Sequence, residues 1–208
     1  EHDLASLRTE VESASARWKA RATELSARRR DTAARLGPAI TTRMQTLGMA
    51  GGRFEVRIES TGDAETSATG LEQVEFLVSA NPGQPPRPLG KVASGGELSR
   101  LSLAVQVTTA RPGDVASRDD SRCMVFDEVD SGVGGAVAEI VGRELASLGR
   151  HAQVLCVTHL PQVAAQGGSH LRVSKLTDGR PTPTQITALP GDERGEDAAR
   201  MLGGISIT

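Results

Sequence analysis

The first stretch of the chain carries apolar residues at the three-and-four spacing of an amphipathic helix. Arg21 interrupts this stripe, which otherwise consists of Leu4, Leu7, Val11, Ala14, Trp18 and Leu25. An a/d stripe of this kind favours one strand of a coiled coil, and an ordinary amphipathic helix on a globular core stays the alternative. Gly37-Pro38 is predicted to break or bend the helix, because proline lacks a backbone donor and disfavours helix in the residue before it.

Beyond Gly48 the apolar pattern changes to the period of two that is typical of strands. Phe54, Val56 and Ile58 alternate with charged residues, and an apolar run over 74–78 follows a polar turn region. This pattern predicts a hairpin with one solvated face. The next segment, 81–88, contains four prolines and is predicted to be an extended connector that forms neither a helix nor a central strand.

A strand–helix–strand pattern occupies the second half of the chain. Apolar runs over 122–126 and 154–157 flank a helical pattern over 133–148, which predicts a βαβ unit with parallel strands. Parallel strands end on the same side of a sheet, so Asp127-Glu128 and Thr158-His159 are expected at one edge, where open α/β sheets bind ligands. The predicted fold class is α/β, with a mostly parallel sheet flanked by helices.

The segment from Ser94 to Glu97 has the form of a helix start. Ser94 and Glu97 have capping-box spacing, and Leu98, Leu101 and Val105 are expected on the buried face of the helix. Gly95-Gly96 lowers helix propensity but leaves first-turn amides open to a phosphate. From these residues alone, an anion site and a plain helix cap are equally good interpretations.

Two adjacent carboxylates at a strand end can divide two tasks. Asp127 can hold Mg²⁺ while Glu128 faces an attacking water, and His159 can sense a phosphate. A metal hydrolase built on Asp127, Asp130 and His159 is a weaker alternative, because the chain offers no second histidine at ligand spacing. The chain contains no Gly-x4-Gly-Lys-Ser/Thr phosphate loop, so it is predicted to lack the main ATP cradle.

Composition and charge narrow the class of protein. The chain has 208 residues, 38% of them hydrophobic, and a net charge of −2, which allows one substantial core and gives no global attraction to nucleic acid. Arg28-Arg29-Arg30 is predicted to be a solvated helix face, with phosphate binding as the alternative. Without a membrane-length apolar run or a signal-peptide pattern at Glu1, a cytoplasmic location is expected. Cys123 and Cys156 are predicted to be reduced core residues.

Several segments resemble the sequence motifs of one protein family. They are Asn81–Gln84, Val92–Arg100, Phe126–Asp130, Cys156–Val163 and Ala199–Gly204. Over about Val74 to Gly204 the sequence is similar to the C-terminal half of the ATPase head of the RecN family, bacterial DNA repair proteins related to the SMC and ABC-type ATPases. The run Val157–Val163 is much closer to this family than to transporter heads.

The resemblance implies a role for each motif residue. The signature motif, which binds the γ-phosphate of ATP held by the opposite subunit, would be Ser94, Gly95, Gly96 and Glu97. Asp127 would be the Walker B ligand of Mg²⁺ and Glu128 the general base. Asp130 would belong to the D-loop that crosses the dimer interface and assists nucleotide binding, and His159 would be the switch histidine.

The same resemblance implies the organisation and the partners. Residues 1–47 would form the base of the returning coiled-coil helix and its connection, and residues 48–208 the C-terminal half of the head. The expected function is ATP-dependent head dimerisation and Mg²⁺-dependent ATP hydrolysis, coupled to DNA binding or tethering in double-strand break repair and recombination.

The expected partners are an N-terminal head half with the Walker A loop, a second copy of the head and double-stranded DNA, with a recombinase as a further candidate and no membrane. The expected location is cytoplasmic and nucleoid-associated, and this chain alone is expected to be inactive. The alternatives are the head of another ABC-type ATPase and a non-catalytic structural or interaction module.

Overall fold

The computed structural model describes residues 2–62, 67–91, 94–110, 123–175 and 184–203. The chain divides into two compact units. Unit 1 comprises residues 1–42 and 51–92, and unit 2 comprises residues 43–50 and 93–208. The predicted division into a coiled-coil base (residues 1–47) and half of an ATPase head (residues 48–208) refers to a longer protein and stays a prediction. Residues 92, 93, 122 and 204, which belong to segments quoted above, lie outside the described residues.

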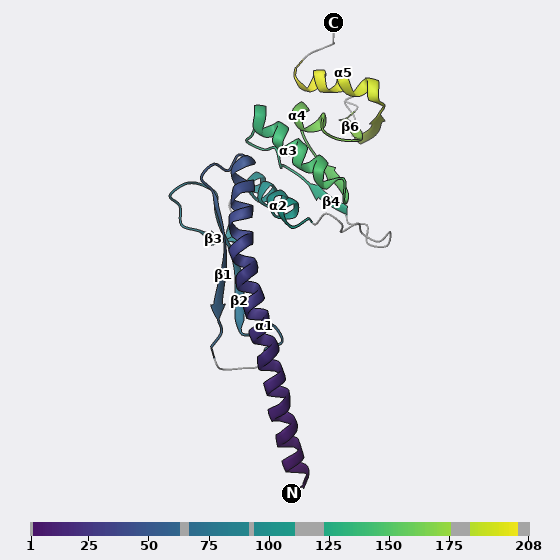
Figure 1. Ribbon diagram of the computed structural model, residues 1–208. Helices are drawn as coiled ribbons and strands as arrows, with labels where there is room; N and C mark the ends of the chain where they lie inside the picture. Colours follow the sequence, from purple (N-terminus) through teal and green to yellow (C-terminus); the bar gives the residue numbers. More distant parts are fainter. Residues whose placement is uncertain (1, 63–66, 92–93, 111–122, 176–183, 204–208) are drawn as a thin grey trace. The chain divides into compact units, whose positions relative to one another are not determined.

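The chain begins with one long helix, α1 (His2–Thr46), seen at the purple end of Figure 1. The break predicted at Gly37-Pro38 was wrong, because α1 continues through Pro38 for about two further turns, and the alternative, a bend, stays a prediction. An interior proline costs about 3 kcal/mol. Ile40 and Met44 beyond it are fully buried, and each such side chain contributes roughly 1.5–3 kcal/mol. Tertiary burial therefore outweighs the local helix-breaking tendency.

Unit 1 contains a small antiparallel sheet. Its strands, β1 (Arg53–Ser60), β2 (Glu72–Ser79) and β3 (Arg87–Pro88), follow the order β1-β2-β3. Phe54 pairs with Val78, and the rings of Phe54 and Phe76 lie 5.6 Å apart. The predicted hairpin is confirmed, and the proline-rich segment supplies only a two-residue edge strand and the short 3₁₀ helix η1 (Leu89–Lys91).

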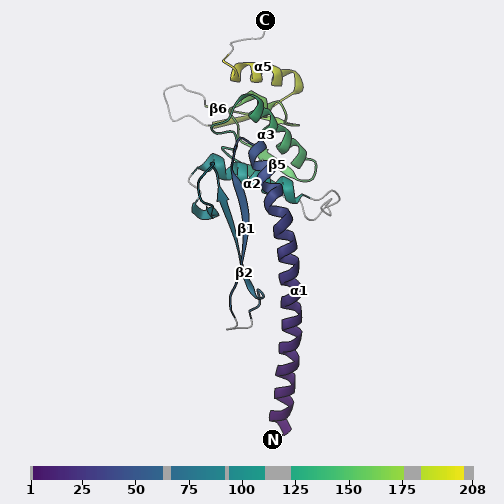
Figure 2. The ribbon, with the colours of Figure 1, turned by 60° about the vertical axis from the view of Figure 1, so that its left-hand side comes forward.

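The hairpin runs beside α1 in both views of the ribbon (Figures 1 and 2). Buried Glu72 at the start of β2 accepts a hydrogen bond from the Ser26 hydroxyl and one from Arg30 at 2.9 Å, and Arg29 lies 3.9 Å away. Arg28 pairs with Glu24 on the helix itself. Each arginine of the triplet thus has a carboxylate partner within unit 1, as a structural helix face requires.

Unit 2 is built on a strand–helix–strand core. β4 (Cys123–Phe126) and β5 (Gln153–Cys156) are parallel and are connected through α3 (Gly135–Leu148). Helices α2 (Gly95–Thr109) and α4 (Pro161–Ala164) pack on α3. Gly142 of α3 permits this approach, since a Cβ there would lie 3.1 Å from the Val163 Cα. The predicted βαβ unit is confirmed.

The core of unit 2 gathers apolar residues from its helices and from the end of α1. The fully or almost fully buried members are Met44, Leu47, Met49, Leu101, Leu103, Ala104, Phe126, Val129, Ala138, Val141, Leu145, Leu148 and Val163. Arg43 forms an ion pair with Glu144 of α3, which fixes residues 43–50 to this unit.

The C-terminal part of unit 2 is an antiparallel hairpin followed by a helix. β6 (His170–Lys175) pairs with β7 (Thr184–Leu189), and α5 (Gly191–Met201) follows. Buried Asp197 of α5 lies 3.1 Å from His170 Nε2 and accepts from Arg200 at 2.5 Å. Among the described strand pairs, β4 and β5 are parallel and the others are antiparallel.

One face of the parallel pair is apolar and open. Val125, Leu155 and Val157 are 66%, 44% and 62% exposed. Cys123, on the same face, is also exposed, so the prediction that it is a core residue was wrong, while Cys156 is half-buried. Both thiols are free, as predicted. None of the described helices combines the length and apolar character needed to cross a lipid bilayer.

Candidate functional site

The helix start predicted at Ser94 is present. Ser94 has extended backbone geometry, with φ −112° and ψ 129°, and its hydroxyl accepts a hydrogen bond from the Glu97 amide at 3.4 Å. Gly95 and Gly96 are the first two residues of α2. First-turn amides have no partner within a helix, and the helix dipole adds positive potential there. The turn therefore has the local geometry of an anion site.

The loop after β4 places two carboxylates in solvent. Asp127 and Glu128 are exposed, whereas Val129 and Asp130 behind them are buried and anchor the loop. Glu128 is the non-glycine residue with a positive φ, 56°, within the described part of the chain. A backbone held in this region is strained by roughly 1–3 kcal/mol, and such strain clusters at functional sites.

The first turns of α2 hold this loop directly. The Ser99 hydroxyl donates to the Asp127 carbonyl at 2.6 Å, and Arg100 Nη1 donates to the Ser131 carbonyl at 2.6 Å. A Cβ at Gly96 would lie 2.9 Å from the Ser131 Cβ, and one at Gly95 would lie 2.6 Å from Glu128 Oε2. The close approach of the loop therefore requires glycine at position 96, whereas at position 95 the exposed carboxylate of Glu128 could move aside.

Ser99 and Arg100 were missed by the sequence reasoning. Of the residues expected on the buried face, Leu101 is buried, Val105 is half-buried and Leu98 is exposed. The buried residues of α2 also include Gly96, Arg100 and Leu103. Burial lowers the pKa of the Arg100 guanidinium, and Glu97 partly offsets this effect. Arg100 follows Gly96 by four residues, so the two share one face of the helix with buried apolar residues. This spacing was the signal that could have identified Arg100 as buried.

The loop after β5 is joined to the loop after β4. The Val157 amide donates to the Phe126 carbonyl at 2.9 Å, one step beyond the paired strands. The Thr158 hydroxyl and the His159 amide both donate to Asp130 Oδ2, the latter at 3.2 Å. Asp127-Glu128 and Thr158-His159 thus follow adjacent parallel strand ends, as the predicted topology requires.

The side chain of Asp130 is buried within its own chain, and its expected place in a loop that crosses a dimer interface stays a prediction. Its side chain is 2% exposed, and its carboxylate faces Thr158 and His159 of the same chain. His159 is itself 71% exposed, with Nδ1 lying 3.4 Å from Asp130 Oδ2. Within the described residues, no hydrogen bond or ion pair joins His159 to Asp127 or Glu128.

Cys156 lies at the end of β5, close to this cluster. Burial, followed by the charges of Asp130 and Asp127, raises the pKa of its thiol to about 11. A thiol with so high a pKa stays protonated at neutral pH and is a poor nucleophile. This agrees with the predicted non-redox role for Cys156.

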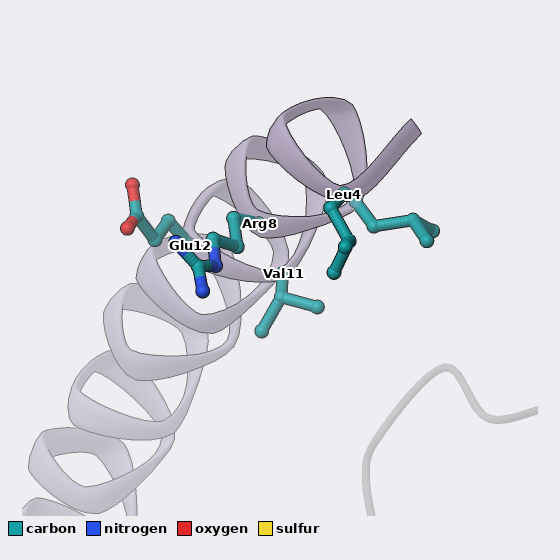
Figure 3. Close-up of a pocket in the computed structure, with 5 residues that line it drawn as sticks. Leu4, Arg8, Val11 and Glu12 are labelled. Carbon is teal, nitrogen blue, oxygen red and sulfur yellow. The ribbon is translucent and has the colours of Figure 1, made fainter. Parts of the chain in front are cut away.

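A metal centre and a surface hollow are two other possible kinds of site. In the part of the chain that the structure describes, no three His, Cys, Asp or Glu side chains converge as metal ligands, so the hydrolase alternative gains no support. A shallow hollow lies on α1 between Leu4, Leu7, Arg8, Val11 and Glu12 (Figure 3). It contains none of the predicted site residues.

Comparison with known proteins gives the family. The chain is 47% identical over 198 residues to the DNA repair protein RecN of Xylella fastidiosa strain 9a5c, covering 95% of this chain and 34% of that protein. It is 43% identical over 205 residues to the DNA repair protein RecN of Vibrio cholerae, covering 99% of this chain and 36% of that protein. The chain is a homologue of the RecN proteins. It spans about a third of the length of these RecN relatives.

The solved structures agree with the RecN assignment at the level of fold. The Smc head domain with a coiled coil and joint from Pyrococcus yayanosii matches with a TM-score of 0.56 and 17% identity, covering 95% of this chain and 36% of that one. The Pyrococcus furiosus Smc head with an extended coiled coil, bound to the C-terminal domain of ScpA, matches with a TM-score of 0.50 and 16% identity. This match covers 80% of this chain and 37% of that one. No family model matches the chain. The predicted α/β head fold is confirmed for this RecN homologue.

Proposed function

We propose that the chain is the signature and Walker B half of the head of an SMC-like DNA repair ATPase. The observation that carries this proposal is the direct contact between the first turn of α2 and the loop that bears Asp127 and Glu128. The proposed phosphate-binding turn and the pair of carboxylates thus hold each other in place within one chain, and in the proposed dimer they would serve two different nucleotides. The homology to DNA repair proteins supports the repair assignment.

The residues at this strand end suit Mg²⁺-dependent ATP hydrolysis. The absent Cβ atoms of Gly95 and Gly96 leave the amides of α2 approachable, and a side chain at Gly96 would collide with the loop. The exposed carboxylate of Asp127 would hold Mg²⁺, which usually takes one or two protein carboxylates together with substrate phosphates. When bound, Mg²⁺ supplies charge neutralisation at the phosphates. Glu128 would accept the proton of the attacking water, and His159 would contact the γ-phosphate.

The open face of β4 and β5 supports an N-terminal head half as the first partner. Both faces of a parallel sheet are normally covered, yet Val125, Leu155 and Val157 face solvent here. An N-terminal half with the Walker A loop would bury this face and supply the ATP cradle that the sequence lacks. This chain alone would then be inactive.

A second copy of the head is the second proposed partner. Ser94, Gly95 and Gly96 would complete the nucleotide held by the other copy, so ATP would join two heads in a two-fold arrangement and hydrolysis would release them. Double-stranded DNA would be tethered by the engaged protein at the nucleoid, in the cytoplasm. A recombinase remains a further candidate partner.

The uncovered seam on α1 supports a coiled coil. Leu4, Leu7 and Val11 are exposed and line the same hollow on α1, in which Figure 3 labels Leu4 and Val11. An a/d seam of this kind buries its apolar side chains when a second helix packs on it. The outgoing helix of the same protein is the proposed partner.

ATP hydrolysis by the chain and by a complete protein that contains it tests this proposal. We expect no phosphate release from the chain alone, and release from the complete protein that EDTA abolishes and linear double-stranded DNA stimulates. Circular dichroism of the chain is the control that its helices are formed. Absence of turnover in the complete protein would favour the non-catalytic module, and turnover indifferent to DNA would remove the coupling to DNA.

A further inference from the structure

Asp130 combines deep burial with an unusual set of partners. Its side chain is 2% exposed, and one oxygen, Oδ2, accepts from the Thr158 hydroxyl and from the His159 amide. The same oxygen lies 3.4 Å from Nδ1 of the His159 ring. A buried carboxylate is costly unless donors surround it, so the two hydrogen bonds, from the Thr158 hydroxyl and the His159 amide, help to account for its place in the core.

The groups that surround Asp130 are held on both sides. Val129, next to it, is fully buried, and the Val133 amide donates to the Asp130 carbonyl at 3.3 Å. On the other loop, the Leu160 amide donates to the Thr158 hydroxyl at 3.0 Å. Asp130 therefore joins two rigid loop segments and is not a freely moving side chain.

The contact with His159 distinguishes the two ring nitrogens. An Nδ1–H that donates to a carboxylate fixes the ring orientation and leaves Nε2 as the nitrogen available to another group. Because the His159 side chain is 71% exposed, Nε2 is accessible from solvent. Nδ1 is thus the ring nitrogen that lies beside the carboxylate, and Nε2 is the one left for another group.

We infer that Asp130 is the positioning residue of His159 and not itself a nucleotide-binding residue. Its buried carboxylate would orient the imidazole so that Nε2 meets the phosphate, with Thr158 holding the carboxylate in place. This inference rests on the proposed ATPase function, and it replaces the expected role of Asp130 at the dimer interface. The geometry assigns Asp130 to its own chain's histidine.

A double-mutant cycle in the complete protein tests the inference. We expect Asp130→Asn to lower kcat for ATP roughly 10- to 100-fold, the usual effect of losing a residue that orients a functional histidine, with little change in KM. In the His159→Ala background the same change should have no further effect, because the group through which Asp130 acts is gone. Asp31→Asn, which removes an exposed carboxylate paired with Arg35, is the matched control.

A second cycle avoids any change to the buried charge. Thr158→Val removes the hydroxyl that holds Asp130 but keeps the carboxylate and the ring. Its smaller loss of kcat should also disappear in the His159→Ala background. Thermal melts of every variant show whether a loss of activity follows a loss of folding, and Thr158→Val decides the question if Asp130→Asn fails to fold.

The outcomes separate this inference from the proposed function. If the parent hydrolyses ATP and the losses of kcat from the single variants multiply in the double variants, Asp130 does not act through His159. That result would overturn the positioning role and leave the proposed function standing. A parent without ATP turnover would overturn the proposed function, and the inference with it. Losses that vanish without His159 would establish that Asp130 acts through the histidine, which a general structural role would not produce.

Discussion

Replacing Glu128 with glutamine in the complete protein is expected to lower ATP turnover roughly 10²- to 10⁴-fold, the range typical of a lost general base. Glutamine keeps the size of the side chain but cannot accept the proton of the attacking water. Glu128 is exposed at a strand end and is held at a φ of 56° beside the first turn of α2. Because Asp127 and the glycines are untouched, ATP binding should persist and engaged dimers should accumulate.

Phosphate release, nucleotide binding and sedimentation with ATP measure the three parts of this prediction. Glu139→Gln is the matched control, since Glu139 is a half-buried glutamate of α3 paired with Arg143. The control should retain the parent turnover. Turnover of Glu128→Gln within a few-fold of the parent would remove Glu128 from the role of base.

Replacing Ser94 with arginine is expected to abolish ATP-dependent dimerisation of heads. Ser94 caps α2 immediately before Gly95 and Gly96, where a side chain of this size would fill the space proposed for the γ-phosphate. The substitution should leave nucleotide binding by each head intact, because the main ATP cradle is expected in the N-terminal half. The clearest measurement is sedimentation velocity in the presence of ATP, with Ser94→Arg introduced into the Glu128→Gln protein. Glu128→Gln is expected to prevent the hydrolysis that separates the two heads.

Ser94→Ala separates the lost helix cap from the filled site. It removes the hydroxyl that accepts from the Glu97 amide, at a cost of about 1 kcal/mol of stability, but adds no bulk. Dimers should therefore form with Ser94→Ala and fail with Ser94→Arg. Undiminished dimers with Ser94→Arg would refute the proposed role of this turn.

The parts of the site that follow strand ends could be predicted from the sequence. Two apolar runs around a helical pattern require parallel strands, and parallel strands bring Asp127 and His159 to one edge. The cap at Ser94 also follows from local chemistry alone. These predictions succeeded because each rests on the covalent order of the chain and on short-range hydrogen bonding.

The rest depended on contacts between distant residues. Pro38 stays helical because burial of Ile40 and Met44 offsets the lost hydrogen bond. Arg100 is buried because the Ser131 carbonyl receives its guanidinium across 31 residues of sequence. Asp130 is likewise buried against a partner 29 residues away, His159. No local pattern specifies such pairings, so propensity and spacing could not reveal them.

A mixing experiment with two inactive variants tests the composite site most directly. Ser94→Arg retains its own Glu128, and Glu128→Gln retains an intact signature turn, so a mixed dimer has one site in which both parts are native. The account predicts that ATP turnover of the mixture rises well above the sum of the two separate proteins. Turnover equal to that sum, at concentrations where the parent protein dimerises, would contradict a site shared between two heads.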